Sequence, residues 1–106
     1  MSESPIKALD YIVEDVGKHL KSSKKRYLWK FSLSNVSHTL VLDASIITGK
    51  VKLTLDGKVL VAGDLSSNVS FQHHFKVDEF AMIILQQSTD FELRINNQTF
   101  IHLLGQ

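Results

Sequence analysis

The sequence predicts a mainly β protein, namely an antiparallel β-sandwich of two duplicated four-stranded meanders with one N-terminal amphipathic α-helix. Three observations predict this fold. Apolar residues have helical spacing near the N-terminus, they alternate with polar residues from about residue 27 onward, and the alternating part contains an internal repeat. The 106 residues include no cysteine, so a single core without disulfides or thiolate-bound metal must stabilise the chain.

The first predicted element is an amphipathic helix over residues 5–21. Ser4 and Pro5 are residue types that cap and begin a helix. Apolar residues then recur three or four positions apart, at Ile6, Leu9, Ile12, Val13, Val16 and Leu20. We therefore expect residues 1–26 to form an N-terminal helix and a basic linker, and residues 27–106 to form the β-sandwich domain.

Short strands with turns between them fill the rest of the chain. Apolar and polar residues alternate with the period of half-buried antiparallel strands. Asp56-Gly57 and Asn96-Asn97 suit tight hairpin turns that need positive φ. The expected strands lie near 27–34, 37–43, 50–56, 58–62, 70–77, 80–86, 90–95 and 98–103.

The strands contain an internal repeat. Residues 31–36 align with 75–80, and residues 51–60 align with 91–100, with strands over strands and turns over turns. Each copy is a four-stranded meander that cannot bury its own apolar face. Two facing copies would therefore make one sandwich.

The first copy resembles the Fas apoptosis inhibitory molecule family. The resemblance lies in the order of three motifs, which are His38-Thr39-Leu40-Val41-Leu42-Asp43, Thr48-Gly49-Lys50 and Leu55-Asp56-Gly57-Lys58. It covers residues 28–103 and implies an all-β sandwich in the cytoplasm, without a catalytic centre, that acts through protein contacts in restraining cell death or protein aggregation. The chain departs from the family in its expected N-terminal helix and in having one domain's worth of strands, where full members carry two.

No residue is expected to have a catalytic, cofactor-binding or metal-ligating role, and the chain is not expected to be an enzyme. The serines lack a Gly-x-Ser-x-Gly elbow, and no glycine-rich phosphate loop occurs. His38 and His73 align in the repeat with Met82 and Trp29, so both are expected in the core.

Contact with a partner is expected at three places: an apolar loop tip, the apolar stripe of the helix, and an open sheet edge guarded by lysines. The loop tip and the stripe could instead cover the sandwich itself. The expected contact residues are Ile46 and Ile47 at the tip, Ile6, Leu9 and Val13 on the helix, and Lys50 and Lys52 as the guard.

The charge and hydropathy of the sequence argue against nucleic acid and a membrane span as partners. The net charge is +1, and one basic cluster (Lys18, Lys21, Lys24, Lys25 and Arg26) predicts at most weak, salt-sensitive attraction to nucleic acid or anionic lipid. We therefore expect no specific nucleic acid. No window approaches the roughly 20 apolar residues of a transmembrane segment, and a cytoplasmic location is expected.

These observations predict a non-catalytic protein-interaction module or subunit without a cofactor. Its partner would be another protein or a second copy of the chain, bound through the helix or an edge strand. Two alternatives remain: a β-sandwich that binds a small ligand, either carbohydrate or lipid, and a structural subunit of a larger assembly.

Overall fold

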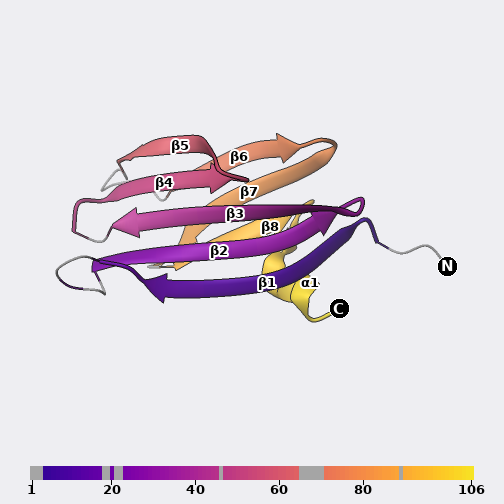
Figure 1. Ribbon diagram of the computed structural model, residues 1–106, viewed down its shortest axis with the longest axis horizontal. Helices are drawn as coiled ribbons and strands as arrows, with labels where there is room; N and C mark the ends of the chain where they lie inside the picture. The colour runs from indigo at the N-terminus through magenta and orange to yellow at the C-terminus, as the bar shows by residue number, and fades with distance from the viewer. Residues whose placement is uncertain (1–3, 18–19, 21–22, 46, 65–70, 89) are drawn as a thin grey trace.

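The computed structural model describes residues 4–17, 20, 23–45, 47–64, 71–88 and 90–106 (Figure 1). Nine strands are followed by one short helix. The elements are β1 (Ile6–Asp15), β2 (Lys24–Leu33), β3 (Val36–Ser45), β4 (Lys50–Leu55), β5 (Lys58–Asp64), β6 (Gln72–Val77), β7 (Phe80–Gln87), β8 (Asp90–Ile95), β9 (Gln98–Thr99) and α1 (Phe100–Leu104).

The strands form two antiparallel sheets, which confirms the mainly β class. One sheet has five strands in the order β1-β2-β3-β4-β5, and the other has four in the order β6-β7-β8-β9. Neighbours in each sheet are neighbours in sequence, so each predicted copy of the repeat forms a meander in a sheet of its own. Strand β1 adds a fifth strand to the first sheet.

The hairpin turns of the two copies contain the same two hydrogen bonds. In the first, Asp56 has a φ of 50°, its N–H donates to the Thr39 carbonyl at 2.8 Å, and its Oδ1 accepts from the Thr39 N–H at 2.8 Å. In the second, Asn96 has a φ of 49° and makes the same two bonds with Ala81, at 2.8 and 2.9 Å. The turn residues therefore correspond in geometry as well as in sequence.

The prediction of an N-terminal helix is wrong, because residues 6–15 form β1. This strand pairs antiparallel with β2 from Ile6↔Leu33 to Asp15↔Lys25, with a register shift between Ala8 and Asp10. The inserted residue, Leu9, breaks the alternation of apolar side chains and produces the helix-like spacing. The expected boundary between residues 26 and 27 consequently falls inside β2, and residues 1–26 are not a helix with a linker.

The two residues of the predicted helix start, Ser4 and Pro5, instead form hydrogen bonds at the beginning of β1, one of them to the β2–β3 turn. The Ser4 hydroxyl accepts the Ile6 N–H at 3.2 Å, and the Pro5 carbonyl accepts the Ser34 N–H at 2.8 Å. These bonds use the same acceptor groups that a helix start would use. Ser4 and Pro5 therefore do supply the acceptor groups that the sequence indicates, but pairing with β2 makes the following residues a strand.

The C-terminal strand expected over 98–103 is also wrong beyond Thr99. Strand β9 has two residues, and α1 follows directly. The Thr99 hydroxyl caps the helix by accepting the His102 N–H at 3.2 Å. Phe100 and Leu103 lie three positions apart and are both buried, as a helix requires. The one helix among the described residues is thus C-terminal.

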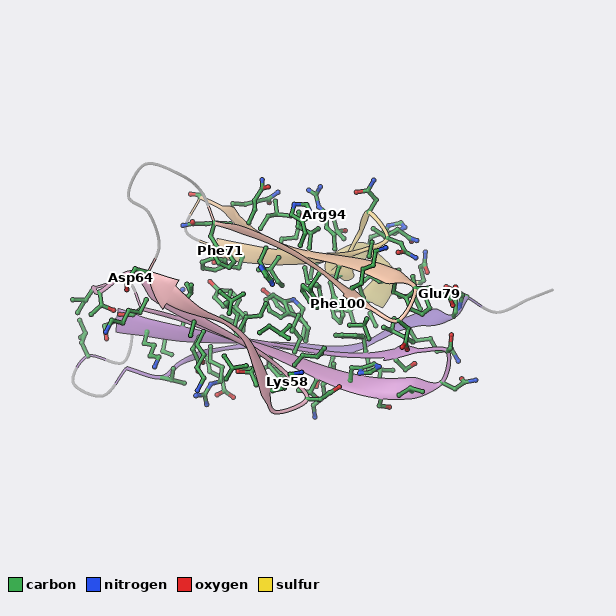
Figure 2. The ribbon with its side chains drawn as sticks, turned by 90° about the horizontal axis from the view of Figure 1, so that it is seen from above. Lys58, Asp64, Phe71, Glu79, Arg94 and Phe100 are labelled. Carbon is green, nitrogen blue, oxygen red and sulfur yellow. The ribbon has the colours of Figure 1, made fainter. Side chains whose placement is uncertain are left out.

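The two sheets lie as two layers with side chains between them (Figure 2). Trp29 stacks between Tyr11 and Tyr27, with ring centroids 6.0 and 5.9 Å apart, and Phe100 from α1 meets the edge of Phe31 at 6.4 Å. Both sheets and the helix contribute to one buried cluster. Its largest fully buried members are Trp29, Tyr27, Phe31, Phe100, Leu33, Leu40, Leu42, Leu53, Met82, Ile84, Leu93 and Ile95.

Candidate functional site

The structure separates the residues that the sequence grouped as partner contacts. Leu9 and Val13 are exposed on β1, and Ile47 is exposed in the β3–β4 connection. Ile6 is buried in the core, which leaves its side chain no surface for a partner. Ile46 lies outside the described residues.

Lys50 and Lys52 do not guard an edge, so that prediction is wrong. They lie on β4, which pairs with β3 on one side and with β5 on the other. Their side chains instead line a cleft of about 580 Å³ at one end of the five-stranded sheet, together with Lys24 of β2. Residues far apart in sequence are thus brought together in one basic group.

One open sheet edge belongs to β1, while β5 ends the same sheet on its other side and β6 and β9 end the second sheet. Strand β1 is the first in its sheet order, and its outer side pairs with no strand among the described residues. Strand β1 exposes apolar side chains, and α1, which packs against β1, also exposes two. We call this region the β1 edge surface; it consists of Leu9, Ile12, Val13, Ile101 and Leu104.

A small aromatic pocket lies next to the β1 edge surface. It has a volume of about 170 Å³ and is lined by residues of β1, β2, β7, β8 and α1, among them Tyr11, Trp29 and Phe91. Sites for drug-sized molecules usually occupy about 300–1,000 Å³. The size of this pocket therefore suits one side chain of a partner better than a drug-sized molecule.

Two tyrosines and one carboxylate determine the polarity of this region. The Tyr27 hydroxyl donates to Asp90 Oδ1 at 3.2 Å. Burial, reinforced by the negative charge of Asp90, raises the pKa of both Tyr11 and Tyr27 above the ordinary value. Both phenols consequently stay neutral and able to donate hydrogen bonds throughout the physiological pH range.

Acidic residues occur on β1 and in the neighbouring pocket, and those of β1 lie opposite Lys30, Arg26 and Lys25 of β2. Asp10, Glu14 and Asp15 belong to β1 itself, and Asp90 and Glu92 line the pocket from β8. Glu92 accepts from Arg94 at 2.7 Å, which neutralises its charge locally. The surface thus combines exposed apolar side chains with an excess of carboxylates on its own strand.

The two histidines expected in the core are half-buried and stack on phenylalanine rings. His38 packs against Phe31 with centroids 5.7 Å apart, its Nδ1 lies 2.7 Å from Asp56 Oδ2, and its Nε2 is buried without a hydrogen-bond partner. His73 stacks on Phe75 at 5.7 Å, and burial together with neighbouring His74 lowers its pKa. The described residues hold no group of three or more potential metal ligands.

Comparisons with known proteins found no relative of this chain. The chain matches no protein-family model, no curated protein and no solved structure. Among the described residues, α1 is too short to cross a bilayer and no other helix is present.

Proposed function

We propose that this chain is a cytoplasmic, non-catalytic protein-interaction module, built as a sandwich of its two sheets, whose partner lies along the outer edge of β1. The observation that carries the proposal is the open edge of a ten-residue strand with Leu9, Ile12 and Val13 exposed on it. The N–H and C=O groups of such an edge can pair with an added strand. The resemblance to the Fas apoptosis inhibitory molecule family supports the same class of function.

The charge of β1 favours a basic partner over a second copy of the chain. An antiparallel pair of β1 strands centred on Ile12 would place Asp10 opposite Glu14 twice, and like charges in opposed positions repel. Registers that reach Lys7 must cross the bulge at Leu9. We therefore expect an extended segment that alternates basic and apolar residues, paired with residues 11–15 beyond the bulge.

The test is selection of binding peptides from a displayed random library, followed by affinity measurement on β1 variants. We expect the bound peptides to alternate basic and apolar residues. Val13→Lys should weaken binding by at least about tenfold, because it removes an apolar contact and adds a positive charge that repels a basic partner. Val36→Lys is the matched control, since Val36 is an exposed valine at the start of β3, in register with Leu33 and Ile6 and therefore at the opposite end of the sheet from Val13.

Two results would contradict the proposal. One is equal weakening by Val13→Lys and Val36→Lys, which would make the effect unspecific. The other is recovery of acidic peptides, which would place the contact on a different surface. Trp29 fluorescence checks that each variant is folded, because this buried ring is the only tryptophan.

A further inference from the structure

One end of the five-stranded sheet exposes apolar side chains on two neighbouring connections. Strands β1 and β3 end, and strands β2 and β4 begin, at the same end of the sheet (Figure 1). Leu20 in the β1–β2 connection is 62% exposed, and Ile47 in the β3–β4 connection is 74% exposed. An isolated exposed apolar residue is ordinary, but two on adjacent connections form a small apolar tip.

Local hydrogen bonds join described residues within both connections. In the β3–β4 connection the Gly49 N–H donates to the Ser45 carbonyl at 3.0 Å and the Thr48 N–H to the Ser45 hydroxyl at 3.2 Å. In the β1–β2 connection the Ser23 N–H donates to the Leu20 carbonyl at 2.9 Å. Ile47 and Leu20 thus lie in connections whose described residues form hydrogen bonds with one another.

A basic cleft lies directly behind this tip. Three lysines line it, namely Lys24, Lys50 and Lys52, and none forms an ion pair with another described residue. The cleft also contains Asp43, which Arg26 holds at 2.8 Å, and Asp64, opposite Lys50 in the β4–β5 register. The Arg26–Asp43 pair cancels locally, so the cleft keeps a positive excess.

We propose that this end of the molecule docks on an anionic lipid bilayer. Ile47 and Leu20 would enter the headgroup region, while Lys24, Lys50 and Lys52 would meet lipid phosphates. An acidic peptide or a nucleic acid could use the lysines but would leave the apolar tip in water, so the combination favours a lipid surface. This inference goes beyond the proposed protein contact and does not depend on it.

The first experiment is cosedimentation of the full chain with vesicles of phosphatidylcholine alone, or with about 30% phosphatidylserine, at low and high salt. We expect binding only with phosphatidylserine, and its loss at high salt. Replacing Lys50 and Lys52 together by glutamate should lower the partition coefficient by at least about 20-fold, since each lysine near the surface contributes about fivefold. Lys58→Glu, at the opposite end of the sheet, should change it by less than about twofold.

A second experiment tests insertion of the tip independently of charge. Ile47→Trp should be quenched by brominated lipid in phosphatidylserine-containing vesicles, with a blue shift of its emission. Val36→Trp is the matched control, because Val36 is 55% exposed on the same sheet at its other end. The native Trp29 is 1% exposed and should contribute no quenching.

Three outcomes would overturn the inference: equal binding to both vesicle types, an equal effect of Lys58→Glu and the Lys50/Lys52 double change, or quenching of Val36→Trp as strong as that of Ile47→Trp. Binding to a soluble polyanion with no quenching of Ile47→Trp on vesicles would likewise overturn it, in favour of a soluble acidic partner. Unchanged circular dichroism shows that each variant is folded.

Discussion

The turn at Asp56 allows the duplication to be tested by exchanging residues between the two copies. Asp56→Asn places in the first copy the residue that the second copy has at Asn96, whereas Asp56→Ala removes the polar side chain. The Asp56 carboxylate accepts from the Thr39 N–H at 2.8 Å and from His38 Nδ1 at 2.7 Å. If the two turns are equivalent, Asp56→Asn should lower the free energy of unfolding much less than Asp56→Ala.

The expected changes in the free energy of unfolding follow from the two hydrogen bonds and the positive φ of Asp56. Each hydrogen bond contributes about 1 kcal/mol net, and alanine at a φ of 50° adds about 1 kcal/mol of backbone strain. Asp56→Ala should therefore lower the free energy of unfolding by about 2–3 kcal/mol. Asp56→Asn keeps the bond to the Thr39 N–H and tolerates the positive φ, so it should cost at most about 1 kcal/mol.

The assay is urea unfolding followed by the fluorescence of Trp29. Asn96→Ala and Asn96→Asp form the reciprocal pair in the second copy, where the side chain accepts from the Ala81 N–H at 2.9 Å. We expect alanine to be the more damaging change at both turns. Equal losses for Asp56→Asn and Asp56→Ala, or a loss below about 0.5 kcal/mol for Asp56→Ala, would refute the reasoning.

The same site predicts a pH dependence. Burial opposes ionisation of Asp56, but hydrogen bonds from His38 and the Thr39 N–H outweigh it and hold the pKa of this carboxyl below its ordinary value. A carboxyl whose pKa is lower in the folded state stabilises that state above the unfolded pKa, near 3.9, and loses this effect as the pH falls through the folded pKa. The advantage of the wild type over Asp56→Asn should therefore shrink below about pH 4.

Four further substitutions have expected outcomes in the same unfolding assay. Gly17→Ala should cost more than about 2 kcal/mol, because a Cβ there would meet the Leu20 carbonyl oxygen at 2.0 Å, whereas Gly63→Ala, which meets nothing within 4 Å, should be nearly neutral. Phe100→Ala should cost about 3–5 kcal/mol, and a smaller loss would mean that α1 does not complete the core. Because its pKa is lowered, His73 binds protons more readily in the unfolded chain, so wild-type stability should fall as the pH drops below about 6.5; His73→Phe should remove that part of the fall.

The part of the fold from β2 to β8 could be predicted from sequence because alternation and turn residues agree there. Leu53 and Leu93, for example, are fully buried at the inward positions that alternation assigns to them. Asp56 and Asn96 have the positive φ that their residue types favour at hairpin turns. Local preference and tertiary structure point to the same answer in these segments.

Strand β1 could not be predicted in this way, because one inserted residue changes the period. Ile6, Ala8 and Tyr11 face the core, and the bulge at Leu9 separates the last two by three positions. Only the pairing of β1 with β2, a long-range contact, identifies the strand. Helix α1 did have a local signal, in the capping Thr99 and the three-residue spacing of Phe100 and Leu103.

The candidate surfaces were predicted only in part for the same reason. The helical spacing predicts that Leu9 and Val13 lie on the apolar stripe of a helix, but they are exposed on the edge strand β1. Lys50 and Lys52 were assigned to an edge strand, but the sequence contains no signal for the order of strands in a sheet. The proximity of Lys24 to both of them depends on that order, and it appears only in three dimensions.

The central claim is that a partner pairs with the outer edge of β1. Its most direct test is hydrogen exchange of the β1 amides, measured by NMR with and without a selected basic-apolar peptide. We expect added protection within residues 11–15, with no change on the β7 amides, because β7 is already paired on both sides. Protection that appears elsewhere while β1 is unchanged would contradict the account.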